Sequence, residues 1–156
     1  MATLTMILVL GYGNDLRSDD AVGRRVAEVV SQWDLPDVTS ISVHQLTPEL
    51  SETLSGVEIA IFVDASMNLL EEVTVTRLTP LESGFSLTHG CDPRSLLTLA
   101  QILYGNCPQG WLVQIPVSDL SIGESLSAIA QTGITQALAK IRRLIPENTA
   151  ENQSLL

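Results

Sequence analysis

The stretch Met6–Glu28 reads MILVLGYGNDLRSDDAVGRRVAE, and it decides the start of the fold. The apolar run at its beginning predicts a buried strand over Thr5–Leu10. Valines recur at helical spacing from Val22 to Val30, which predicts a helix over Ala21–Trp33. A loop with two glycines and two adjacent carboxylates separates these elements. The order is therefore strand, glycine-bearing loop, helix.

The two acids of this loop, Asp19 and Asp20, stand where the helix is predicted to begin. A carboxylate at that position accepts hydrogen bonds from free backbone N–H groups, so one acid is expected to be the N-cap. Asp19 comes first and is the better placed cap. A second acid is more than a cap needs, which leaves Asp20 available to face a cleft.

The rest of the chain alternates strands with helices. A short helix is expected to start at Thr47 as cap, with Pro48 in its first turn. The fourth strand has an alternating pattern typical of a sheet edge. Strands are predicted over 38–45, 57–63, 73–78 and 111–117, and longer helices over 93–104 and 126–144, the last with a bend at Gly133. This order predicts a three-layer α/β fold with a mainly parallel, about five-stranded sheet.

Length and composition limit the function. The 156 residues predict a single domain, with a polar tail over about 146–156 that is expected to fray. The formal net charge of −10 argues against nucleic acid and anionic membranes as partners. The apolar start lacks the charged region and cleavage site of a signal peptide, and the chain has no membrane-length apolar run, so we expect a cytoplasmic protein.

Three metal-capable side chains are predicted to meet at one edge of the sheet. Asp20 follows the first strand, Asp64 follows the third, and His89 lies in the loop before the helix over 93–104. Ligands bind outside the carboxyl ends of the strands in open α/β sheets. Singly, each residue has an ordinary explanation as a turn, cap or surface residue. Together, two carboxylates and an imidazole suit a divalent ion such as nickel or zinc and leave coordination positions open.

Other catalytic motifs fit less well. The Gly11-Tyr12-Gly13 turn lacks the third glycine of a dinucleotide fingerprint, and its acids would repel a pyrophosphate. The chain has neither a Walker loop nor a Gly-x-Ser-x-Gly elbow. Cys91 is only two residues from His89, a separation that rarely gives a Cys–His pair. Cys91 and Cys107 show no zinc-site spacing.

The string Gly11-Tyr12-Gly13-Asn14, followed by Asp19-Asp20 and Gly23, resembles the opening motif of the hydrogenase maturation endopeptidases. The resemblance extends from about residue 6 to about residue 145, with Ala21 in place of a glycine usual in that family. It implies removal of a C-terminal extension from the nickel-loaded large-subunit precursor of a nickel–iron hydrogenase. The precursor is then the partner, and it supplies the nickel.

By the same resemblance, Asp20, Asp64 and His89 are the nickel ligands and the catalytic residues. Gly13 and Asn14 shape the loop. The segment after the second strand, which begins at His44, departs from part of the family, and His44 is either a second functional histidine or a strand-end polar residue. Two other functions stay open: a nickel-sensing or chaperone-type protein that binds without cutting, and a small hydrolase that carries its own metal ion.

Overall fold

The computed structural model describes residues 5–68, 71–82 and 91–146. They form five strands and four α-helices, with one short 3-10 helix. The strands are β1 (Ile7–Tyr12), β2 (Val38–Val43), β3 (Ile59–Ser66), β4 (Thr74–Leu78) and β5 (Gln109–Pro116). The helices are η1 (Ser18–Ala21), α1 (Val22–Ser31), α2 (Leu50–Ser55), α3 (Pro93–Tyr104) and α4 (Ala128–Leu144).

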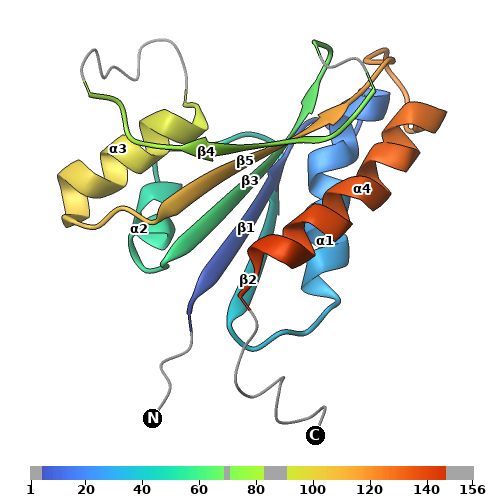
Figure 1. The fold of residues 1–156 in the computed structure, drawn as a ribbon. Helices are drawn as coiled ribbons and strands as arrows, with labels where there is room; N and C mark the ends of the chain where they lie inside the picture. Colours follow the sequence, from blue (N-terminus) through green and yellow to red (C-terminus); the bar gives the residue numbers. More distant parts are fainter. Residues whose placement is uncertain (1–4, 69–70, 83–90, 147–156) are drawn as a thin grey trace, which may run out of the picture.

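The strands build one sheet in the order β2-β1-β3-β5-β4. All neighbours are parallel except β4, which runs antiparallel to β5 at the edge. Helices α1 and α4 cover one face, and α2 and α3 cover the other (Figure 1). This arrangement confirms the predicted three-layer α/β fold and the edge position of the fourth strand. In the described part of the chain, no helix is long and apolar enough to cross a membrane.

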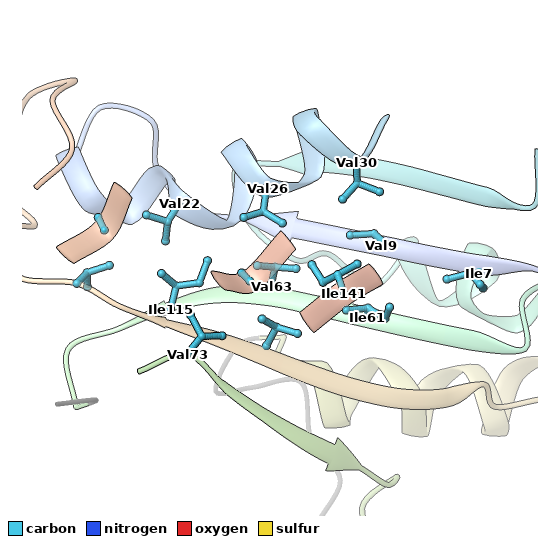
Figure 2. Close-up of a cluster of buried hydrophobic side chains, with 14 of the residues drawn as sticks. Ile7, Val9, Val22, Val26, Val30, Ile61, Val63, Val73, Ile115 and Ile141 are labelled. Atoms are coloured by element: carbon cyan, nitrogen blue, oxygen red, sulfur yellow. The ribbon is translucent and has the colours of Figure 1, made fainter. Parts of the chain in front are cut away.

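Alternating side chains of the central strands fill two separate cores. Figure 2 shows the core beneath α1 and α4, where Val9 and Val63 of the sheet meet Val26 of α1 and Ile141 of α4. The neighbouring residues of β1 and β3 point to the other face and pack against α2 and α3. Each central strand is buried on both faces, as expected for a parallel sheet between helix layers.

Two strands, β1 and β3, extend further toward their carboxyl ends than their apolar runs predict, whereas β2 and β5 end slightly earlier than predicted. β1 continues through the motif glycine to Tyr12, and β3 continues to Ser66. Asp64 therefore lies inside β3, paired with Gln114 of β5, and not in the loop after the strand. Hydropathy misses these ends because polar residues there still complete the ladder of backbone hydrogen bonds.

One predicted helix detail is wrong. Thr47 does not cap α2, because residues 47–50 form a turn and the helix begins at Leu50 without a side-chain cap. The bend at Gly133 stays a prediction: α4 is continuous through this residue, and a Cβ at Gly133 would lie 2.5 Å from a methyl group of Ile115. This glycine lets the helix approach β5. The predicted bounds of α3 are confirmed, whereas the predicted frayed tail from residue 147 lies outside the described residues.

Candidate functional site

The candidate site lies at the carboxyl ends of β1 and β3, which are neighbours in the sheet. Glycines allow the loop after β1 to fold back tightly there. A Cβ at Gly23 would collide with the carbonyl oxygen of Val63, and a Cβ at Gly13 would collide with that of Asp20. Gly13 also has a φ of +151°, which favours glycine. The motif glycines therefore bring the start of α1 against the ends of both strands.

Asp20 is half-buried in η1, and one of its carboxylate oxygens, Oδ2, accepts a hydrogen bond from the Asn14 backbone N–H at 2.8 Å. Asn14 in turn uses its side-chain oxygen to accept from the Leu16 N–H at 2.9 Å. Among the described residues, the other oxygen of Asp20 has no hydrogen-bond donor. The loop thus fixes the Asp20 carboxylate while leaving part of it free to accept a ligand.

Asp64 is the second carboxylate of the site. Burial raises its pKa to about 6, and the charge of Asp20 contributes in the same direction. The Ala65 N–H, at 2.8 Å, and the Tyr12 hydroxyl stabilise the charged form and oppose this rise. Burial and the Asp64 charge also raise the pKa of Tyr12, which keeps its hydroxyl protonated. Two of the three predicted ligands, Asp20 and Asp64, are therefore close enough to interact electrostatically.

The third predicted ligand, His89, lies outside the described residues. The segment that follows it is described: Asp92 caps α3 by accepting from the Ser95 N–H at 2.7 Å. The charge of Asp92 acts on Tyr12, and Cys91 packs in the same core as Tyr12. The start of α3 is thus near the two carboxylates. Within the described ranges, no three His, Cys, Asp or Glu side chains are grouped to hold a metal ion.

Asp19 does not have the predicted capping role. Neither η1 nor α1 has a side-chain cap in the part of the chain that the structure describes. The fully buried Asp19 carboxylate instead accepts four hydrogen bonds, from the N–H groups of Ser118, Asp119 and Ser127 and from the Ser127 hydroxyl, at 2.6–3.1 Å. Burial alone raises the pKa of a carboxylate, but these donors together lower the pKa of Asp19. Asp19 therefore joins residues 118–127 to the loop.

Backbone hydrogen bonds join the loop that contains Asp19 to residues 118–127. The Ser18 N–H donates to the Gly123 carbonyl at 2.8 Å, and the Gly123 N–H donates to the Leu16 carbonyl at 2.9 Å. The Ser18 hydroxyl donates to the Ser121 carbonyl at 2.8 Å, and Arg17 Nε donates to the Leu120 carbonyl at 3.1 Å. The two loops therefore form one hydrogen-bonded unit beside Asp20.

The remaining predicted site residues have simpler surroundings. Gly13 donates its N–H to the Val43 carbonyl at 3.2 Å, which ties the loop to the end of β2. His44 follows β2 directly and is exposed. The roles predicted for Gly13, Asn14 and His44 stay predictions.

Sequence reasoning missed two features of the site. Tyr12 stands between the motif glycines, and its place next to Asp64 follows from the pairing of β1 with β3. That pairing offered a signal, because two neighbouring parallel strands bring Tyr12 and Asp64 to the same end of the sheet. The donors to Asp19 lie about 100 residues away in sequence, and no local pattern identifies them.

The donor set fits a divalent cation in part. Two carboxylates in a partly desolvated place repel each other, as the raised pKa of Asp64 indicates. A divalent cation between them would relieve that repulsion and replace the lost hydration. Oxygen ligands and an imidazole from His89 would suit nickel or zinc. The described residues supply only the two carboxylates, so further ligands must come from His89 or from a substrate.

No protein-family model matches the chain, and no curated protein matches it. Several solved structures share its fold. The NiFe-hydrogenase maturation protease HycI from Thermococcus kodakarensis is 22% identical, with a TM-score of 0.71 over 92% of this chain and 94% of that protein. HybD from the same organism is 19% identical, with a TM-score of 0.69 over 91% of this chain and 100% of that protein.

A third similar structure is the hydrogenase maturating endopeptidase HybD from E. coli, 23% identical, with a TM-score of 0.64 over 90% of this chain and 91% of that protein. These identities are low, and the likeness covers nearly the full length on both sides. The chain therefore has the fold of the hydrogenase maturation proteases.

Proposed function

We propose that this chain is an endopeptidase that removes a C-terminal extension from the nickel-loaded large-subunit precursor of a nickel–iron hydrogenase. The observation that carries the proposal is the carboxylate pair Asp20 and Asp64, held at the ligand-binding edge of this particular fold. The fold shared with proteins named as hydrogenase maturation proteases supports it. The opening motif of the sequence points to the same activity.

In this proposal nickel arrives as part of the substrate. Asp20, Asp64 and His89 bind the ion that the precursor already carries, so the protease acts only after metal insertion. Asp64, with a pKa of about 6, is mostly deprotonated at neutral pH and therefore available as a ligand. A divalent ion next to the cleavage point polarises the scissile carbonyl or a water molecule as a Lewis acid. Asn14 and Gly13 hold the loop that presents Asp20.

The direct test is incubation of the purified chain with nickel-loaded and with nickel-free precursor, followed by mass measurement. We expect a mass loss equal to the extension for the loaded precursor alone. His89→Ala, Asp20→Asn and Asp64→Asn should each leave the precursor uncut. Binding without any mass loss would support a nickel-sensing or chaperone-type protein and overturn the proposal.

Metal content separates the remaining alternative. A hydrolase with its own ion should be purified with about one metal ion per chain, whereas a protease that reads the substrate's nickel should contain little. We propose a cytoplasmic location for the chain, together with the precursor that it would process.

A further inference from the structure

Two large apolar side chains stand exposed on the joined loops next to Asp20. Leu16 is 61% exposed and Ile122 is 92% exposed. Single exposed apolar residues are common on protein surfaces and need no special reason. These two differ because residues about 100 positions apart in sequence are joined by backbone hydrogen bonds, which brings Leu16 and Ile122 together on the loops beside Asp20.

A continuous chain of hydrogen bonds connects the Asp20 carboxylate to both residues. The Asn14 N–H donates to Asp20, the Leu16 N–H donates to the Asn14 side chain, and the Gly123 N–H donates to the Leu16 carbonyl. Ile122 immediately precedes Gly123. The backbone at Leu16 and Ile122 is therefore tied to the loop that holds the carboxylate.

The backbone that carries Ile122 is also held from its other side. The Ser121 carbonyl accepts from the Ser18 hydroxyl, and the Ser121 N–H and hydroxyl both donate to Asp119. Asp19 closes the base of the same loop through Ser118 and Ser127. A loop with this many internal bonds has little conformational entropy to lose when a partner binds.

We infer that Leu16 and Ile122 are the apolar contact of the site with the precursor chain, next to the metal ion that the precursor carries. This inference rests on the proposed function. Charge complementarity supports this partner, because the adjacent Asp20 and Asp64 are both acidic and match the divalent cation that the proposed precursor carries. The contact would orient the chain while the carboxylates bind the ion. Leu16 and Ile122 are thus binding residues, separate from the catalytic group.

The test is steady-state cleavage of nickel-loaded precursor by the wild type, Leu16→Ser and Ile122→Ser. Loss of one buried aliphatic side chain from an interface should raise KM roughly tenfold, with kcat within about twofold of the wild-type value. Ile102→Ser is the matched control. Ile102 is 62% exposed near the end of α3. The chain continues from there to the start of β5, at the amino ends of the strands and away from the site.

An unchanged KM for both site variants, or an equal rise for Ile102→Ser, would overturn the inference and leave the proposed function intact. If the wild type does not cut the precursor, the proposed function fails, and the fluorescence anisotropy of labelled precursor then tests the contact by itself. Weaker binding by the two site variants alone would still support it. Equal binding by all four proteins, or no binding at all, would refute it. Circular dichroism should show the same fold throughout.

Discussion

Asp19 is fully buried and Asp64 is half-buried, both near the same loop, and their surroundings are opposite. Asp19 accepts four hydrogen bonds, and its pKa is lowered. Asp64 is desolvated with little hydrogen bonding and lies near a second acid, so its pKa is raised to about 6. The difference indicates that the first carboxylate stabilises the fold and the second is held ready for a positive partner. Surroundings, not residue type, separate structural from reactive acids.

The largest effect should come from removing a charge at the reactive pair. We expect Asp64→Asn and Asp20→Asn each to slow processing of nickel-loaded precursor by about a thousandfold, or ~4 kcal/mol, because each loses a charged ligand. The melting temperature of Asp64→Asn should not fall, since a repelled buried charge is removed. Asp34→Asn is a matched control: it removes one exposed charge at a positive φ of 52°, which Asn accepts. Full activity in either site variant would reassign that residue.

The next effect concerns stability. Asp19→Asn should lower the free energy of unfolding by roughly 3 kcal/mol, because an amide NH₂ would face donors that now share the carboxylate. Asp20→Asn should change it by less than about 1 kcal/mol, since Asn keeps an acceptor for the single Asn14 N–H. Urea unfolding of both variants measures the contrast. A larger loss for Asp20→Asn would reverse the roles of the two acids.

A smaller effect is expected from pH. The folded pKa of Asp64, about 6, is above the unfolded value near 3.9, so the folded state binds this proton more tightly. The stability of the metal-free chain should therefore gain a contribution as pH falls from 7 through 6 toward 4, by at most about 3 kcal/mol. Asp19 acts in the opposite sense, because its lowered pKa makes protonation destabilising. The free energy of unfolding of the wild type and of Asp64→Asn, measured at several pH values, isolates the contribution of Asp64. An identical pH dependence in both proteins would contradict the raised pKa of Asp64.

The smallest effect should follow from Tyr12→Phe. The Tyr12 hydroxyl stabilises the charged form of Asp64, so its loss should raise the pKa of Asp64 further, by less than about one unit, or ~1 kcal/mol. Carbon-13 NMR titration of the Asp64 carboxyl measures this directly. A fall in the pKa would mean that the hydroxyl favours the neutral form.

Much of the fold could be predicted from sequence because it depends on local patterns. The apolar runs of β1 and β3 and the Asp92-Pro93 start of α3 each identify an element within a short window. The order of strands and loops predicted that Asp20 and Asp64 lie at one edge of the sheet, and the charge of Asp20 does act on Asp64. The role of Asp19 could not be predicted in this way. The local sequence is the same whether this Asp caps a helix or accepts hydrogen bonds from residues far away in the chain. Only the tertiary placement of Ser118 and Ser127 distinguishes them.

The hydrogen bonds between Asp19 and its donors also affect the order in which parts of the nascent chain reach their final structure. They join residues 99 to 108 positions apart, and closing such long loops is entropically slow. During synthesis β1 and α1 emerge first, and residues 118–127 follow about 100 residues later. We expect the Asp19 carboxylate to stay hydrated until then, since burying it without its donors is costly. The loop that presents Asp20 would therefore reach its final form only after residues 118–127 have been synthesised, so that a shorter nascent chain lacks the finished site.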